Sequence, residues 1–234
     1  MMTIAAVFNC SDGVVVCADS EETIHDYAKR STSRKVNVFE YPQIGIRVGL
    51  AGAGHSDWIR MFVEKLHPHL PSTPPPPSWT MMQKSIEDFT QDFFAKYLVP
   101  YAIDPNQRPQ VDMVLAVNFL SSSILYKIVA NAVTTEPLFA CVGAGQAAMQ
   151  KIVDSLLKPS LTVRQCASLA IYVMSRVKQE VPGCGGNTNV LMIPQLGNYA
   201  WVPTKKIREL EIIFDDIEMR KFEEMAEEII KQSV

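Results

Sequence analysis

Apolar and polar residues alternate in short blocks over the first fifty residues of the chain. The apolar blocks occupy residues 3–8, 14–18, 36–39 and 44–51. Ser11-Asp12-Gly13 separates the first two blocks and is a hairpin signal, because aspartate and glycine tolerate the backbone angles of tight turns. The pattern therefore predicts four β-strands, with a polar loop over residues 20–34.

After residue 55 the apolar residues recur at every third or fourth position, the spacing that gathers them on one face of a helix. One helix is predicted to begin at His55 or Ser56, and a longer one is capped by Ser78 and ends at Pro100. Their apolar stripes are Trp58, Ile59, Phe62 and Leu66 in the first helix, and Met82, Ile86, Phe89, Phe93 and Tyr97 in the second. The proline-rich residues 71–77 predict a stiff spacer between them, with a polyproline recognition segment as the alternative.

The second half of the chain repeats the order of strands followed by helices. Strands are predicted at residues 111–119, 124–130, 138–142, 189–193 and 199–202, and helices at 145–157 and 163–179. Residues 204–234 predict a C-terminal extension, with a strand at 210–214 and then a helix capped by Asp215, with Glu218 at its third position. Because strands and helices occur in clusters, we predict an α+β fold in residues 1–203: a four-layer α/β/β/α sandwich.

Composition narrows the function classes. The 234 residues are 47% hydrophobic and 20% charged, which is typical of one globular domain that needs neither disulfides nor a metal for its core. The net charge of -3 and the lack of a basic block argue against a nucleic-acid partner. No apolar stretch is long enough to span a membrane, and no signal peptide is recognised.

The cysteines and histidines carry no metal-site pattern. Five cysteines are scattered without a CxxC pair, and the four histidines are dispersed as well. An odd number of cysteines in apolar runs indicates free thiols in a reducing compartment. We therefore expect a cytoplasmic protein without a metal or an organic cofactor.

Three residues with catalytic potential lie at the ends of predicted strands. Thr3 begins the first strand, Asp19 closes the second, and Lys35 opens the third. A threonine hydroxyl is a weak nucleophile unless a base lies beside it, and a threonine that is the first residue of its chain carries its own base in the α-amine. The three positions are candidate functional residues, because a rigid sheet can hold a side chain in place at a strand end.

This constellation resembles the proteasome β-subunit family of N-terminal-nucleophile (Ntn) hydrolases, including its bacterial ATP-dependent relatives. The resemblance rests on Thr-Ile-Ala-Ala-Val from Thr3, Asp-Gly-Val-Val-Val-Cys-Ala-Asp-Ser ending at Ser20, Thr23, and Lys35 at the family spacing. Three glycine-containing stretches are similar to family landmarks: residues 49–54, Gly143-Ala144-Gly145 and Cys184-Gly185-Gly186. The resemblance extends from residue 3 to about residue 203.

The resemblance implies a role for each site residue. Thr3 would be the nucleophile and its freed α-amine the base, Lys35 would lie beside the hydroxyl, and Asp19 would orient Lys35. A backbone N–H near Gly52 would face the oxyanion, and Thr23 would help to hold the substrate as an added strand.

The resemblance also implies a substrate and an assembly. It implies peptide or unfolded-protein substrates and a homo-oligomeric ring that encloses the sites. It leaves open whether an ATP-dependent unfoldase is a partner.

Five positions depart from the family pattern, one of them being Glu21, which stands where the family has an arginine after its Asp-Ser. Ala144 replaces a supporting serine, Val181 stands where the family has an aspartate, and Cys184 replaces a second serine; Glu180 is the candidate substitute for the aspartate. Met2 replaces the glycine of the family's self-processing site. Thr3 can act only after Met1 and Met2 are removed, and if translation starts at Met2 ordinary aminopeptidase trimming would expose it.

Three alternatives stay open at the sequence level. The first is a catalytically inactive proteasome-like subunit with a structural or binding role, which Ala144 and Val181 favour. The second is a nucleotide-binding enzyme, because Gly143-x-Gly145-x-x-Ala148 follows a strand and opens a helix. The third is a hydrolase that uses Cys184 as its nucleophile.

Overall fold

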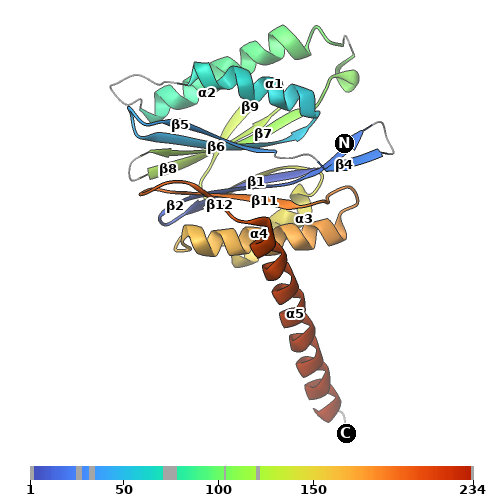
Figure 1. Ribbon diagram of the computed structural model, residues 1–234. Helices are drawn as coiled ribbons and strands as arrows, with labels where there is room; N and C mark the ends of the chain where they lie inside the picture. Colours follow the sequence, from blue (N-terminus) through green and yellow to red (C-terminus); the bar gives the residue numbers. More distant parts are fainter. Residues whose placement is uncertain are drawn as a thin grey trace.

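The computed structural model describes residues 3–24, 28–31, 35–70, 78–102, 104–119 and 122–232, with the backbone alone at 22–24, 28–31, 105 and 222–232. Its centre consists of two five-stranded antiparallel sheets that lie face to face (Figure 1). The first has the order β10-β1-β2-β11-β12 and the second the order β5-β6-β7-β8-β9.

The strands of the first sheet are β1 (Ile4–Cys10), β2 (Gly13–Asp19), β10 (Phe139–Gly143), β11 (Thr188–Pro194) and β12 (Ala200–Trp201). The strands of the second sheet are β5 (Val36–Tyr41), β6 (Ile46–Gly54), β7 (Val111–Phe119), β8 (Ser122–Val129) and β9 (Ala132–Glu136). Side chains of β1 alternate between two cores: Ala5 and Val7 face the second sheet, whereas Ile4 and Phe8 face the helices. Because both faces are covered, these strands are apolar at consecutive positions rather than at every second one.

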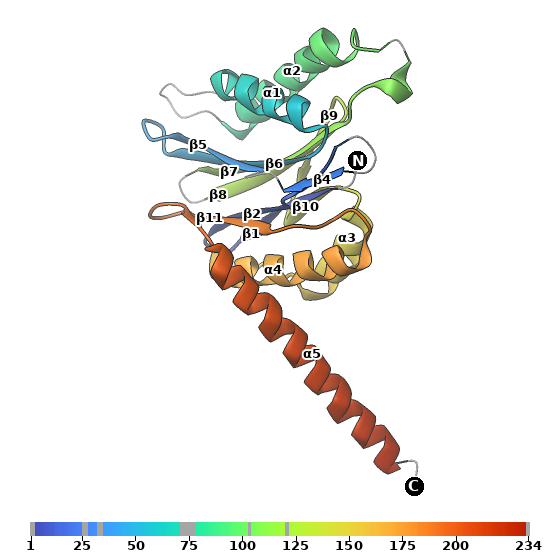
Figure 2. The same ribbon diagram turned by 45° about the vertical axis from the view of Figure 1, so that its right-hand side comes forward.

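Two pairs of helices cover the outer faces of the sheets and complete the four layers (Figures 1 and 2). The helices α1 (Ser56–Leu66) and α2 (Trp79–Phe93) pack on the second sheet. The helices α3 (Gln146–Leu156) and α4 (Val163–Glu180) pack on the first sheet. The predicted α/β/β/α sandwich is therefore confirmed.

Short helical segments continue two of these elements and one loop. A 3₁₀ turn (η1, His67–His69) follows α1, a π-helical segment (η2, Phe94–Leu98) continues α2, and a further 3₁₀ turn (η3) spans Pro105–Gln107. Ser78 caps α2 as predicted, because its Oγ accepts the Met81 N–H at 3.2 Å.

The C-terminal helix α5 (Thr204–Gln232) begins against α4 and then projects away from the layers (Figure 2). The predicted strand at residues 210–214 is wrong, because Ile207, Leu210 and Phe214 recur at helical spacing and pack on the core of the first sheet. Asp215 is likewise not a helix cap but an interior residue of α5, where its carboxylate pairs with Arg176 at 2.6 Å. The predicted segment 71–77 lies outside the described residues.

A second prediction that the structure corrects is the loop at residues 20–34. Within it β3 (Glu21–Ile24) and β4 (Ala28–Ser31) form a separate two-stranded antiparallel sheet. These strands are polar, so they show no alternation that would reveal them in the sequence. Their position is relevant to the site, because β3 begins directly after β2 and Ser20.

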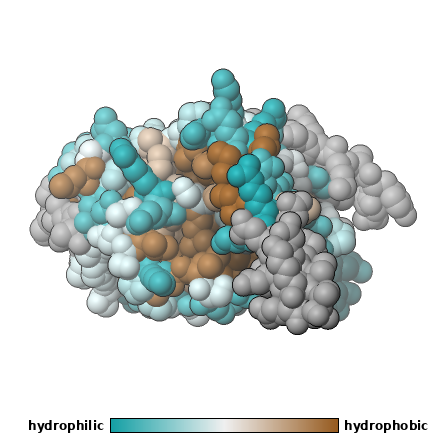
Figure 3. Space-filling model, turned by 90° about the horizontal axis from the view of Figure 1, so that it is seen from below, coloured by the Kyte–Doolittle hydropathy of each residue, from teal (hydrophilic) through white to brown (hydrophobic). Residues whose placement is uncertain are grey.

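The outer face of the α3–α4 layer is partly apolar. Seen from the α5 side, apolar side chains gather in the middle of this face and polar ones surround them (Figure 3). Among the exposed hydrophobic residues are Leu156 on α3 and Ile213 and Ile217 on α5. None of the helices in the described part of the chain is long and apolar enough to cross a membrane.

Candidate active site

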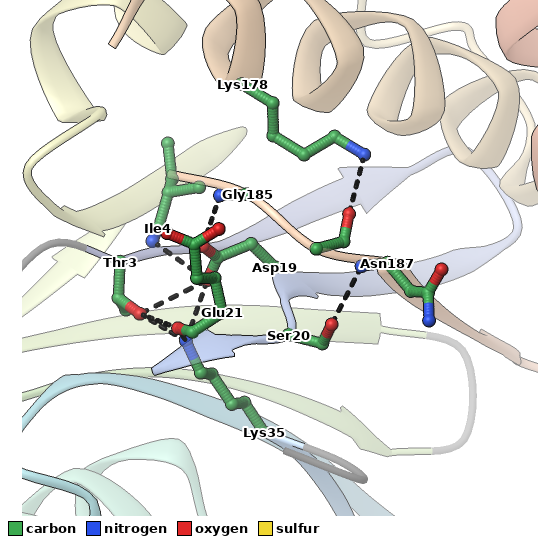
Figure 4. A network of polar contacts seen from close by, with 10 residues as sticks. Thr3, Ile4, Asp19, Ser20, Glu21, Lys35, Lys178, Gly185 and Asn187 are labelled. Carbon is green, nitrogen blue, oxygen red and sulfur yellow. Dashed lines mark hydrogen bonds and ion pairs between the residues drawn. The ribbon is translucent and has the colours of Figure 1, made fainter. Parts of the chain in front are cut away.

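The three strand-end residues meet at one end of the sandwich (Figure 4). Thr3 precedes β1, Asp19 closes β2, and Lys35 precedes β5, so the two sheets together bring them into contact. The Lys35 ammonium donates to the Thr3 hydroxyl and pairs with Asp19 Oδ1 at 2.9 Å. The Thr3 hydroxyl oxygen also lies 3.2 Å from Asp19 Oδ1.

The ammonium of Lys35 has three N–H groups and three acceptors. They are Thr3 Oγ1, Asp19 Oδ1 and the carbonyl oxygen of Glu21. Because an ammonium has three donors and no acceptor, this set uses its whole hydrogen-bonding capacity and fixes its orientation. The first residue of β3 thus contributes through its backbone.

Asp19 is fully buried and accepts hydrogen bonds on both carboxylate oxygens. Oδ1 receives the Ile4 N–H at 3.3 Å, and Oδ2 receives the Gly185 N–H at 3.1 Å. Burial raises the pKa of Asp19 above its ordinary value, whereas Lys35 and the two N–H groups oppose that shift. Lys35 and the two N–H groups therefore offset only part of the cost of burying this carboxylate.

The arrangement can activate a hydroxyl. Thr3 is buried, with 2% of its surface exposed, and the side chain of Lys35 is 12% exposed. A positive charge in contact with the hydroxyl oxygen favours its deprotonated form, and a low-dielectric surrounding strengthens this effect. The Thr3 carbonyl is fixed as well, because it accepts the Ala144 N–H at 2.9 Å.

Gly52 lies in β6, one residue beyond the pair formed by Val36 and Ala51, and therefore at the same end of the sheet as Lys35. A Cβ at this position would lie 2.5 Å from Met113 Sδ and 2.9 Å from Ile59 Cγ2. Close packing thus requires a glycine here, whatever its N–H binds; its predicted role at the oxyanion stays a prediction.

Thr23 lies in β3, where its backbone pairs with Lys29, and its side chain lies outside the described atoms. Its predicted contact with substrate therefore stays a prediction too.

The three possible supporting residues lie in different surroundings. Ala144 is exposed and contributes its backbone N–H to the site. Glu180 is exposed at the end of α4, and among the described residues no hydrogen bond or ion pair joins its side chain to Thr3, Asp19 or Lys35. Cys184 is buried beside Gly145, whose N–H interacts with the Cys184 thiol.

The thiol of Cys184 is held in its neutral form. Burial raises its pKa to about 11; Asp19 and Glu21 add to this shift, and Lys35 opposes it. Because the thiolate is the nucleophilic form, this environment disfavours Cys184 as a nucleophile at neutral pH. All five cysteines are buried and free.

Sequence reasoning assigned no role to two groups at the site, the N–H of Gly185 and the carbonyl of Glu21. Gly185 lies in the Cys184-Gly185-Gly186 landmark, but no sequence signal marks its N–H as a donor to Asp19. The residues that the structure describes contain no group of three or more His, Cys, Asp or Glu side chains that could hold a metal ion.

Comparison with curated proteins gives no match. Solved structures of Anbu proteins are similar in fold. The helical assembly of the Anbu complex from Pseudomonas aeruginosa has a TM-score of 0.78 at 14% identity, covering 96% of both chains. Anbu (Gly-1 mutant) from Hyphomicrobium sp. strain MC1 has a TM-score of 0.76 at 13% identity, covering 96% of this chain and 99% of that one. Anbu, described as an ancestral beta-subunit, from Yersinia bercovieri has a TM-score of 0.73 at 13% identity, covering 94% and 96%.

A family model gives a match at the level of sequence. The model is that of the proteasome subunit, and it matches residues 3–193, which include Thr3, Asp19, Lys35 and the loop that carries Gly185. The chain therefore belongs to the proteasome subunit family.

Proposed function

We propose that the protein is a threonine-type peptidase that cleaves peptide bonds through Thr3. The observation that carries the proposal is the contact of one ammonium, that of Lys35, with both the Thr3 hydroxyl and the buried Asp19 carboxylate. Each residue alone has ordinary structural roles. Their meeting around the hydroxyl of a buried threonine supports a nucleophile better than a turn cap or a strand end.

The reaction requires the α-amine of Thr3, which is freed when Met1 and Met2 are removed. An α-amine has a pKa near ~8, so a substantial fraction is neutral at physiological pH and can accept the proton of the hydroxyl. Thr3 Oγ1 then attacks the peptide carbonyl carbon and forms a tetrahedral oxyanion. Collapse of this tetrahedral intermediate breaks the C–N bond of the peptide, and the proton passes from the α-ammonium to the leaving amine.

The second half of the reaction restores the enzyme. Water attacks the ester on Thr3 while the α-amine accepts its proton. The bond between the carbonyl carbon and Oγ1 then breaks, the α-ammonium returns the proton to Oγ1, and the acid product leaves. Lys35 lowers the free energy of the negative charge at Oγ1, and Asp19 orients Lys35 through their ion pair. The N–H of Gly52 is the proposed donor to the oxyanion, and Thr23 lies in the strand that would pair with an extended substrate.

The second candidate function is that of an inactive subunit with a structural or binding role. Ala144 has no hydroxyl to offer the α-amine, and Glu180 is exposed at the end of α4 rather than buried beside Thr3. In this case Met1 and Met2 would remain in the mature protein.

We further propose that the protein assembles into a homo-oligomeric ring around its sites, in the cytoplasm. Its family, the helical assembly named for the Pseudomonas aeruginosa relative, and the exposed apolar residues on α5 support self-association. The five free cysteines support a reducing compartment. The substrate class is peptides or unfolded proteins, and an unfoldase partner remains a proposal to be tested by pull-down.

Turnover of fluorogenic peptides by Thr3→Ala tests the proposed chemistry. Removing the nucleophile should lower turnover at least ~1,000-fold. Thr3→Ser should retain measurable turnover because it keeps the hydroxyl and the amine. The matched control is Thr90→Ala, which removes a buried threonine of α2 remote from the site and should leave turnover unchanged. Turnover that survives in Thr3→Ala would refute the proposal.

A further inference from the structure

The loop between α4 and β11 closes the Asp19 end of the site. Gly185 donates its N–H to Asp19 Oδ2 at 3.1 Å, and its carbonyl accepts the Glu21 N–H at 3.2 Å. Two residues later, Asn187 donates its N–H to Ser20 Oγ at 2.8 Å (Figure 4). The loop is therefore bonded to three consecutive residues at the end of β2 and the start of β3.

The opposite side of the same loop is bonded to α5. Glu211 Oε1 accepts a hydrogen bond from Lys178 Nζ at 2.8 Å and lies 3.3 Å from the hydroxyl of Thr188. Lys178 Nζ also donates to Thr188 Oγ1 at 2.8 Å and to the carbonyl of Gly186 at 3.4 Å. Arg208, one turn earlier on α5, donates to Asn187 Oδ1 at 3.1 Å.

One residue in these contacts, Thr188, is paired with a residue of the site. Thr188 is directly opposite Asp19 in the ladder between β2 and β11, so the residue that Glu211 holds is the cross-strand neighbour of the buried carboxylate. Thr188 is 2% exposed, and the side chains of Lys178 and Glu211 are 15% and 22% exposed. A partly buried ion pair that shares a hydroxyl has fewer alternative geometries than a surface pair, because each partner loses hydrogen bonds when it moves.

The loop has few polar side chains of its own: apart from the contacts above, Cys184 is buried in the core of the first sheet and Val181 packs against that core. Gly185 and Gly186 carry no side chains, and Gly186 has a φ of +70°, so its backbone lies in the left-handed region. Val181, at the start of the loop, can form no side-chain hydrogen bond. Glycine loops lose more conformational freedom on ordering than other segments, so contacts from outside must offset that entropy.

We propose that Glu211 on α5 is a positioning residue for the Thr3 site: with Lys178 it holds residues 185–188 so that the Gly185 N–H remains on Asp19. Arg208 assists through Asn187. The C-terminal helix is therefore part of the support of the active site. The kinetic part of this inference rests on the proposed function, whereas the structural part does not.

Amide hydrogen exchange of the full-length protein tests the structural part. Glu211→Ala removes the acceptor shared by Lys178 and Thr188, and the exchange of the Gly185 and Asn187 amides should rise about tenfold, in the range that changes in a contact network produce. Glu211→Gln keeps an acceptor oxygen without the charge and should give a smaller rise.

The matched control is Glu218→Gln. Glu218 also joins α5 to α4, through Tyr172 at 2.6 Å and Arg176 at 3.2 Å, but it does not contact the loop. The exchange of the Gly185 and Asn187 amides in Glu218→Gln should match that of wild type. Equal exchange in Glu211→Ala and wild type would overturn the inference, whether or not the protein is a peptidase.

Steady-state kinetics test the functional part. Glu211→Ala should lower kcat about tenfold with KM unchanged, because the perturbed groups are those around Thr3 rather than those that bind substrate. Glu218→Gln should leave both constants unchanged. A change in KM alone, or equal losses in the two variants, would overturn the positioning role.

The two possible failures are distinguishable. If wild type has no turnover, the proposed function fails, and hydrogen exchange alone decides the inference. If wild type is active and Glu211→Ala retains full kcat, the inference fails and the proposed function stands. Should Glu211→Ala not fold, as judged from its thermal melt, Arg208→Gln tests the same loop through its contact with Asn187, with the same expected direction.

Discussion

The substitution Lys35→Met removes the positive charge at the site and retains a side chain of similar length. Asp19 would then be a fully buried carboxylate that has lost its ion pair with Lys35. The Thr3 hydroxyl and the Glu21 carbonyl would each lose a donor as well. The substitution therefore tests whether Lys35 and Asp19 form an interdependent pair.

The expected loss of stability is large. Breaking a buried ion pair on one side costs about 3–5 kcal/mol, because an uncompensated charge is left in a low-dielectric site. For a domain of this size each kcal/mol shifts the melting temperature by about 2–4 °C, so the shift should be about 6–20 °C at pH 8. The double variant Lys35→Met/Asp19→Asn should recover about half of this loss, because the unpaired buried charge is removed. The other half remains because an amide has only one acceptor oxygen for the N–H groups of Ile4 and Gly185.

The loss of stability in Lys35→Met should depend on pH in a defined direction. Burial already raises the pKa of Asp19, and without the ammonium of Lys35 the pKa should rise further. A carboxyl whose folded pKa lies above its unfolded value of ~3.9 binds more protons in the folded state. Its contribution to the free energy of unfolding therefore falls as pH rises from the unfolded to the folded pKa, and is constant above it. The deficit of Lys35→Met relative to wild type should be smallest near pH 4 and largest at pH 8.

Urea denaturation of wild type, both single variants and the double variant at several pH values measures these quantities. The exposed pair of Lys206 and Glu209 provides the control, since Lys206→Met removes a cation from a pair with side chains 58% and 46% exposed and should change stability little. The idea of an interdependent pair would be refuted if Lys35→Met lost little free energy of unfolding, if that loss did not depend on pH, and if adding Asp19→Asn to Lys35→Met did not change it.

Two further predictions concern the surroundings of Thr3. Cys184, with its pKa raised to about 11 and 5% of its surface exposed, should react with iodoacetamide at pH 8 at least ~100-fold more slowly than free cysteine, as followed by peptide mass spectrometry; rapid modification with loss of turnover would instead favour a cysteine nucleophile. Gly143 has a φ of +103°, and a Cβ there would lie 2.1 Å from the Thr3 carbonyl oxygen, so Gly143→Ala should destabilise the fold by about 2 kcal/mol or more in urea denaturation. Gly197→Ala, with a φ of +89° and open space around its Cβ, isolates the backbone strain, and equal costs in both variants would contradict the clash at Thr3.

The layers of the fold follow from features that the sequence displays. Ser11-Asp12-Gly13 joins β1 to β2 as the turn residues predict, and the apolar stripe of α2 is buried against the second sheet. Such elements are predictable because their apolar residues repeat at the period of the helix or strand, and the same residues are the ones that are buried in the fold.

The prediction also missed the strand β9 (Ala132–Glu136). Two other errors have separate physical causes. The polar strands β3 and β4 are held by backbone pairing, which carries no hydrophobic period. In α5 the short apolar run ending at Phe214 is compatible with a strand or a helix, and the choice is made by the more distant Ile207, which packs on the same core.

The candidate site also contains some groups that the sequence could predict and others that it could not. Thr3, Asp19 and Lys35 could be predicted because their side-chain chemistry is distinctive and each stands at a strand end. The N–H of Gly185 could not be assigned, because any residue has one, and its partner Asp19 lies far away in sequence. The role of Glu211 is visible only once α5 is seen to lie against the loop that carries Gly185.

The central claim is that the nucleophile and the base belong to one terminal residue, Thr3. Its most direct test is the mass of the purified protein before and after reaction with a β-lactone that acylates an activated hydroxyl. The account predicts a chain that begins at Thr3 and one acyl group, located on Thr3 by peptide mass spectrometry and absent from Lys35→Met. Mature protein that still carries Met1 and Met2, or an acyl group on another residue, would contradict it.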